Sequence, residues 1–304
     1  MKPFLNPHAE QFRKKISKKI KQIHSKRKNL IIQLLRQAGA PLTVSEWFGR
    51  LGNNIQQVSM GILYAQKHHL RFISPQHELI RSIAYRAQGP YQLLPKLKNR
   101  FFSFLGSESD PDTDLEYEYI RDNFYEVAQR YIYPNLLVQK LEPLDENCLV
   151  IHLRGGDIFS TTSAPHEYYV QNPLSYYSHL IKQFKRVIIV SEPGDQNPIL
   201  PRLREEFSIE IQSSSVAEDF ATLLRAKNLA SSGVGTFAVA AALCSQNLQN
   251  FYYSDRYLTE HLNPEMLIGK VNTVCIRLPN YIKIGEWNMG DENRELLLNY
   301  QIPF

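Results

Sequence analysis

The chain has 304 residues, of which 43% are hydrophobic and 21% are charged. This composition is typical of a folded globular protein and excludes a disordered chain, and the length suggests about two domains. Three cysteines, Cys148, Cys244 and Cys275, lie in apolar surroundings without CxxC spacing. We therefore expect buried thiols in a reducing compartment, and neither a disulfide framework nor a zinc site.

Basic charge is concentrated near the N-terminus. The formal net charge is +5, but residues 13–28 contain nine Lys and Arg and no acid, and subtracting these nine leaves −4 for the remainder. Apolar residues such as Ile16, Ile20 and Ile23 recur at helical spacing, which predicts an amphipathic helix over residues 8–36 within a basic extension of residues 1–40. Two roles stay open for it: packing on the body of the protein, or peripheral contact with an anionic membrane.

The charge pattern and the distribution of apolar residues also indicate which partners and which location to expect. A single basic helix with few aromatic residues, beside an acidic body, argues against a nucleic acid partner. No apolar run is long enough to span a membrane, and the basic N-terminus is not followed by the apolar core of a signal peptide. We expect a cytoplasmic protein, peripheral to the inner face of the membrane if the basic helix binds lipid.

Residues 41–144 are expected to form the N-terminal domain. The pattern predicts strands at Pro41–Trp47 and Leu70–Ser74, with a helix over Asn53–His69 between them. An extended stretch at 99–105 and a polar loop at 106–114 precede a helix over 115–139, which Pro134 interrupts. We expect a Rossmann-like domain that is less regular than the one that follows.

Residues 145–304 have a clearer α/β pattern. Short apolar runs predict strands at Cys148–Leu153, Arg186–Ser191, Ile209–Ser213, Asn228–Ser232 and Asn250–Tyr253. Helical stretches lie between them at Pro173–Phe184, Asn197–Phe207, Val216–Lys227 and Thr236–Ser245. Strands that alternate with helices of this length predict a parallel sheet covered on both faces, and hence a Rossmann-like domain.

Two glycine-containing loops follow strands of this sheet. Residues 152–157, His-Leu-Arg-Gly-Gly-Asp, follow the first strand, and residues 231–237 follow the fourth. Ligands of open α/β sheets bind beyond the carboxyl ends of the strands, so both loops can face one cleft. The Arg154 guanidinium suits a phosphoryl group, and a helix that begins near Thr236 can hold a phosphate on its backbone N–H groups. Purely structural roles stay open, including a core His152 and a salt bridge between Arg154 and Asp157.

With a third stretch, these loops resemble the signatures of the fucosyltransferase superfamily of GT-B glycosyltransferases. Residues 49–54, Gly-Arg-Leu-Gly-Asn-Asn, are similar to GRxGNQ, and residues 152–157 are similar to HxRxGD. Residues 218–220, Glu-Asp-Phe, with 235–237, Gly-Thr-Phe, are similar to the last signature. The resemblance implies two Rossmann-like domains facing a cleft. It also implies an inverting, metal-independent transfer of a sugar to a saccharide acceptor, without a cofactor; GDP-fucose is the expected donor, and another GDP-sugar stays open.

The resemblance further implies roles for the matching residues. Arg154 would bind the donor diphosphate and stabilise the leaving group, while His152 and Asp219 would contact the nucleoside. Thr236 with its neighbouring backbone would hold a phosphate, and Arg50 with Asn53 would reach across the cleft toward the sugar or phosphate. The neighbouring residues Gly52, Asp157, Gly235 and Phe237 of the signatures are also expected to bind substrate.

The base that takes the acceptor proton is expected in residues 160–169, where His166 and Glu167 are the candidates, although a plain surface loop is the alternative. Gly155 stands where many family members have a second arginine, and Gly235 replaces the usual Ser or Thr. A non-catalytic nucleotide-sugar or saccharide-binding module with a degenerate site therefore stays the rival reading. The acidic run Asp110–Asp114 lacks the glycine and glutamate of a calcium loop, so a solvated loop is expected there rather than the metal site of a GT-A enzyme.

Overall fold

The computed structural model describes residues 41–44, 46–87, 115–139, 141–159, 168–193, 197–288 and 290–303, with Asp157 described by its backbone alone. Several sequence predictions lie outside these residues: the basic helix over 8–36, the extended stretch at 99–105, the acidic run at 110–114, and the candidate bases His166 and Glu167.

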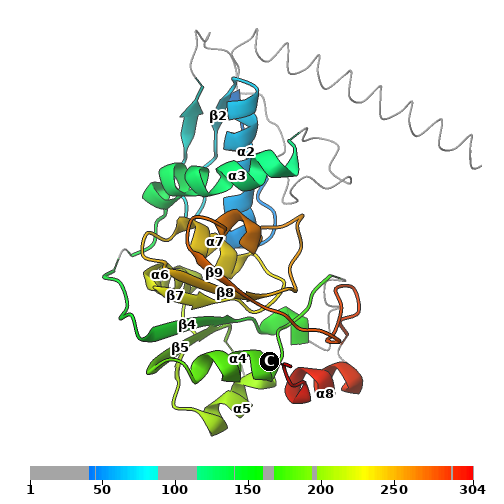
Figure 1. Ribbon diagram of the computed structural model, residues 1–304. Helices are drawn as coiled ribbons and strands as arrows, with labels where there is room; N and C mark the ends of the chain where they lie inside the picture. Colours follow the sequence, from blue (N-terminus) through cyan, green and yellow to red (C-terminus); the bar gives the residue numbers. More distant parts are fainter. Residues whose placement is uncertain are drawn as a thin grey trace, which may run out of the picture.

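A six-stranded sheet forms the centre of the C-terminal half (Figure 1). Its strands are β4 (Cys148–Leu153), β5 (Arg186–Ser191), β6 (Glu210–Gln212), β7 (Asn228–Ala230), β8 (Asn250–Ser254) and β9 (Asn272–Ile276). They lie in the order β6-β5-β4-β7-β8-β9, and all neighbours are parallel. This is the 3-2-1-4-5-6 order of a doubly wound Rossmann sheet, so the predicted parallel sheet is confirmed. The order reverses between β4 and β7, which is where such sheets bind ligands.

Helices cover both faces of this sheet because its strands are apolar on both sides. Leu149, Ile151 and Leu153 of β4 belong to the core on the face of α4 (Leu174–Ile181), α5 (Ile199–Glu206) and α8 (Asp291–Asn299). Cys148 and Val150 belong to the core on the other face, with α6 (Val216–Arg225) and α7 (Phe237–Cys244). The alternation follows from the two-residue period of a strand.

The described N-terminal half differs from the expectation of a second Rossmann-like sheet. Its strands β1 (Pro41–Leu42), β2 (Arg71–Ile73) and β3 (Ala84–Arg86) form a small mixed sheet in which β1 and β2 are parallel and β3 is antiparallel to β2. The helices there are α2 (Leu51–Lys67) and α3 (Tyr117–Val127), which continues through η1 (Ala128–Ile132) and η2 (Tyr133–Asn135). Helix α2 is buried on nearly all sides, and polar side chains such as Gln56 and Gln57 are buried together with its apolar ones.

The two halves share one hydrophobic core. This core combines residues of α2 and α3 with residues of α6 and α7, and in Figure 1 α2 and α3 lie directly against α7. Polar contacts cross the same boundary: Gln129 Nε2 donates to the carbonyl oxygens of Leu243 and Ser245 at 2.8 and 2.9 Å. The hydroxyl of Tyr117 donates to Glu265 Oε2 at 2.8 Å, in η4 (Pro264–Leu267). The N-terminal half is therefore packed on the α6–α7 face of the sheet.

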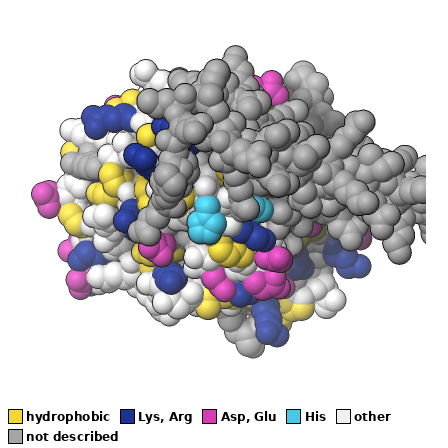
Figure 2. All heavy atoms as spheres, turned by 90° about the horizontal axis from the view of Figure 1, so that it is seen from above, with side chains coloured by type: hydrophobic (Ala, Val, Ile, Leu, Met, Phe, Trp, Pro, Cys, Tyr) yellow, Lys and Arg dark blue, Asp and Glu magenta, His cyan; other side chains and the backbone are white. Residues whose placement is uncertain are grey.

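The cysteine prediction is wrong for one residue. Cys148 and Cys244 are buried, but Cys275 is exposed. Strand β9 is at the edge of the sheet and only its last residue, Ile276, is buried, so Cys275 meets solvent. Among the described helices, none has the length and apolar character needed to cross a membrane. At the end of the molecule that carries β2, basic, acidic and apolar side chains of described residues are interspersed (Figure 2).

Candidate functional site

The loops that follow β4 and β7 come together at the carboxyl edge of the sheet. A Cβ atom on Gly235 would lie 3.9 Å from Nη1 of Arg154, so the guanidinium reaches the loop before α7. The Arg154 carbonyl oxygen accepts a hydrogen bond from Asn197 Nδ2 at 2.7 Å, which fixes the backbone of the first loop. The side chain lies over the ring of Tyr169, with its guanidinium carbon 5.1 Å from the ring centroid.

His152 is the last buried polar residue of β4. It is 8% exposed, and its Nδ1 lies 3.3 Å from the hydroxyl of Ser232. Burial, followed by the nearby guanidinium groups of Arg154 and Arg50, lowers the pKa of His152 to about 3. The imidazole is therefore neutral near pH 7, and it can exchange hydrogen bonds but not supply positive charge.

The N-terminus of α2 meets the N-terminus of α7 at this site. The Thr236 hydroxyl donates to Asn53 Oδ1 at 2.9 Å, and it makes no capping hydrogen bond to α7. A Cβ on Gly52 would lie 2.5 Å from Thr236 Oγ1 and 2.9 Å from its backbone carbonyl carbon. Glycine at position 52 therefore allows two helix ends from the two halves of the chain to approach each other, and both ends present backbone N–H groups.

Arg50 reaches the same edge from the N-terminal half and forms an ion pair with Glu192. Glu192 directly follows β5, and a Cβ on Gly156 would collide with its carboxylate, so this acid lies against the glycine loop after β4. Glu192 was not among the site residues predicted from the sequence. Its position directly after the buried strand β5 could have indicated a site residue, because the parallel strands of this sheet all end at the edge where the site lies.

Phe237 is the first residue of α7, and its ring packs against the ring of His152. Its ring centroid lies 5.2 Å from that of His152 and 5.3 Å from that of Phe220. The described contacts of Phe237 are with protein rings, and these contacts account for the aromatic residue at this position.

Asp219 lies in the first turn of α6, beyond β6. Its carboxylate accepts hydrogen bonds from Gln212 Nε2 at 2.9 Å and from the backbone N–H of Ser214 at 3.2 Å. Burial raises its pKa, while these hydrogen bonds oppose the rise. The structure thus places Asp219 in the first turn of α6, hydrogen-bonded to the end of β6 and the loop that follows it, and its contact with a nucleoside stays a prediction.

A pocket adjoins the loop before α7. It is bordered by Gly233, Val234 and Gly235 on one side and by Tyr257 and His261 on the other, at the carboxyl ends of β7 and β8. This pocket therefore lies between the segments that follow β7 and β8, and its lining does not include Arg154. Among the described residues, no three His, Cys, Asp or Glu side chains are grouped so that they could hold a metal ion.

Two solved structures resemble this one weakly. The glycosyl transferase family 9 from Veillonella parvula DSM 2008 is 12% identical, with a TM-score of 0.31, over 44% of this chain and 36% of that chain. POFUT1 in complex with GDP is 12% identical, with a TM-score of 0.38, over 71% of this chain and 98% of that chain. No protein-family model and no curated protein matches the chain. Similarity this weak does not establish the fold class. The fold class rests on the strand order described above.

Proposed function

We propose that this chain is a GT-B glycosyltransferase that moves a sugar from a nucleoside diphosphate sugar to a saccharide acceptor. GDP-fucose is the expected donor, and the transfer inverts the anomeric centre without a metal ion. The observation that carries the proposal is the position of Arg154: its guanidinium lies at the switch point of a Rossmann sheet, against the loop before α7.

Arg154 would supply the charge that the reaction needs. An acceptor hydroxyl attacks the anomeric carbon, the bond from that carbon to the diphosphate oxygen breaks, and the bonding electrons leave with the nucleoside diphosphate. A guanidinium packed over the Tyr169 ring would stabilise this developing negative charge with little reorganisation, and preorganised electrostatic stabilisation is usually the largest single contribution to catalysis. Backbone N–H groups at the start of α7 would bind the same diphosphate.

The other site residues would contact different parts of the donor. His152 is neutral, so it would hydrogen-bond to the nucleoside rather than to the diphosphate. Arg50 would approach the sugar or phosphate from the opposite side, and its ion pair with Glu192 places it at the glycine loop. His166 and Glu167 remain the candidates for the base that takes the acceptor proton.

A turnover assay tests the proposal and separates it from a non-catalytic binding module. We expect the protein to release GDP from a GDP-sugar, with release stimulated by a saccharide acceptor and unaffected by EDTA. Arg154→Lys keeps the charge but loses the planar fork, so the rate should fall about a hundredfold to a thousandfold. Arg202→Lys is the control, because Arg202 is on the exposed side of α5. A binding module would bind the donor and leave it intact, and a GT-A enzyme would lose activity in EDTA.

A further inference from the structure

The segment Tyr169–Asn172, which precedes α4, lies beside both loops of the site. Gln171 pairs with Gly233 in an antiparallel bridge, and the N–H of Val234 donates to the carbonyl of Val170 at 3.0 Å. The N–H of Asn172 donates to the carbonyl of Ser232 at the same distance. Gly233 has φ +106°, and a Cβ there would collide with the Val170 carbonyl oxygen. This short segment therefore fixes the backbone of the loop before α7.

The first residue of the segment contacts the other loop. The Tyr169 side chain is 1% exposed, and the guanidinium carbon of Arg154 lies 5.1 Å from its ring centroid. On another side the Trp287 ring meets it edge to face at 5.4 Å. A cation over a desolvated aromatic face is attracted more strongly than one over an exposed face. The contact also restricts an arginine side chain that has many rotamers in water.

A buried polar network holds the Tyr169 ring in place. The Tyr169 hydroxyl donates to Gln171 Oε1, and Gln171 Nε2 donates to the Tyr177 hydroxyl at 2.7 Å. The Tyr281 hydroxyl donates to the Gln171 carbonyl oxygen at 2.9 Å. Since these groups are buried, moving the ring would leave polar atoms without partners, which is costly.

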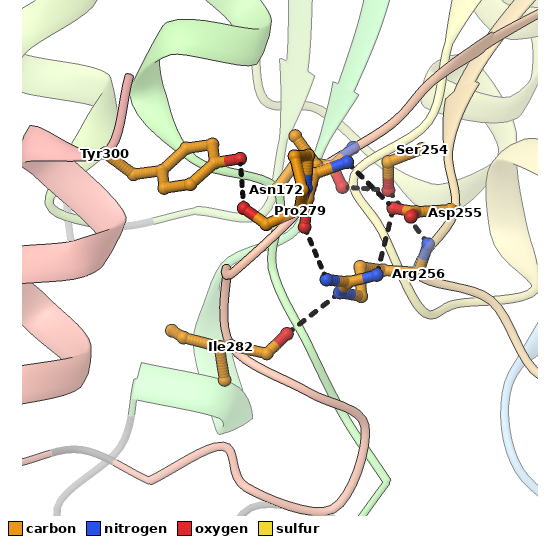
Figure 3. A network of polar contacts seen from close by, with 8 residues as sticks. Asn172, Ser254, Asp255, Arg256, Pro279, Ile282 and Tyr300 are labelled. Carbon is orange, nitrogen blue, oxygen red and sulfur yellow. Dashed lines mark hydrogen bonds and ion pairs between the residues drawn. The ribbon is translucent and has the colours of Figure 1, made fainter. Parts of the chain in front are cut away.

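Tyr281 and Trp287 belong to the C-terminal segment, which is itself anchored to the sheet (Figure 3). Arg256, two residues after the end of β8, donates from Nε to the Ile282 carbonyl at 2.9 Å and from Nη2 to the Leu278 carbonyl at 2.6 Å. The Tyr300 hydroxyl donates to the Pro279 carbonyl at 2.8 Å. Figure 3 also shows Ser254 bonded to Asn172, at 2.5 Å, so the anchor reaches the Tyr169–Asn172 segment.

We propose that Tyr169 is a positioning residue for Arg154. Because Tyr169 is the first residue of the segment that hydrogen-bonds to the loop before α7, it also links the position of the guanidinium to that loop. The proposal rests on the proposed function in one respect: it takes Arg154 to be the group that binds the donor diphosphate. Tyr169 touches no donor atom in this account and acts through the arginine.

Calorimetric titration with GDP tests this in the full chain. Tyr169→Leu removes the aromatic face and should weaken binding about threefold to thirtyfold, which is the range of a cation–π contact. Tyr169→Phe keeps the face but removes the hydroxyl that donates to Gln171 Oε1, so it should lose less affinity than Tyr169→Leu. Tyr176→Leu is the matched control, because Tyr176 is equally buried in the same core and lies on α4. In an Arg154→Ala background, Tyr169→Leu should cause no further loss.

A second measurement needs neither a donor nor a folded Leu variant. In wild-type protein, the Nε–H resonance of Arg154, assigned by its loss in Arg154→Ala, should be shifted upfield by the Tyr169 ring current and should remain shifted in Tyr169→Phe. An unshifted resonance in the wild type overturns the proposal. So does unchanged GDP affinity in a folded Tyr169→Leu protein. If the wild type binds no nucleotide, the proposed function fails, and the resonance alone decides the role of Tyr169.

Discussion

At the scale of single residues, burial affects His152 and Arg154 differently although both stand at the end of β4. The imidazole can release its proton and remain buried as a neutral ring, whereas a guanidinium stays charged in proteins and needs compensating contacts. Tyr169 provides such a contact for Arg154. One strand end thus presents a neutral hydrogen-bonding group and a fixed cation side by side, which suits a nucleoside joined to a diphosphate.

The neutral His152 makes stability depend on pH. Its pKa is about 3 in the folded protein and near 6.5 in the unfolded chain, so the unfolded chain binds the additional proton between these values. The free energy of unfolding should therefore fall as pH decreases below about 6.5, by roughly 1.4 kcal/mol at pH 5.5 from this residue. Urea unfolding at pH 7.5 and 5.5 measures it. His152→Asn should lose less stability across this interval, and equal losses in both proteins would contradict the account.

At the scale of elements, sequence patterns predicted the C-terminal strands well. Strands β4 and β5 have the predicted bounds because a strand buried on both faces is an uninterrupted apolar run. The prediction missed β9 and α8, since the edge strand is half exposed and the helix Asp291–Asn299 is mostly polar. In the N-terminal half, strands of two or three residues are too short for periodicity to define their direction.

The contact between α2 and α7 gives a prediction for Gly52. Gly52→Ala adds a methyl group 2.5 Å from Thr236 Oγ1, where backbone also lies close, so the helices must separate. The free energy of unfolding should fall by about 1–3 kcal/mol, measured by urea denaturation, despite the better helix propensity of alanine. Gly155→Ala is the control for stability: its nearest neighbour would be 3.7 Å away, so its effect should be within about 0.5 kcal/mol. Equal effects of the two substitutions would refute a close approach at Gly52.

At the scale of the whole molecule, the site depends on contacts between distant parts of the chain. The sequence motifs predicted Arg154, Thr236 and Asn53 as site residues. In the structure Thr236 hydrogen-bonds to Asn53, and Arg154 lies near the loop before α7. Glu192 and Tyr169 were not identified as site residues, because their contacts with Arg50 and Arg154 follow from the sheet topology and not from local spacing. The roles of His166, Glu167 and Asp157 stay predictions.

The charge of residues 13–28 gives a prediction about membranes. Nine basic residues without an acid should bind anionic vesicles, with each charge near the surface contributing about 1 kcal/mol. Replacing Lys14, Lys18 and Lys21 by Glu should therefore reduce sedimentation with phosphatidylserine-containing vesicles strongly and leave sedimentation with neutral vesicles unchanged. If a chain lacking residues 1–36 binds anionic vesicles as well as the full chain does, the extension is not the membrane contact.

The most direct test of the central claim is calorimetric titration with GDP, GDP-fucose, GDP-mannose and UDP-sugars, on the wild type and on Arg154→Ala. We expect selective binding of the guanine nucleotides, and this binding should be lost when the Arg154 guanidinium is removed from the switch point. If the protein binds none of these nucleotides, or if Arg154→Ala binds guanine nucleotides as tightly as the wild type does, the assignment of Arg154 to a donor site is contradicted.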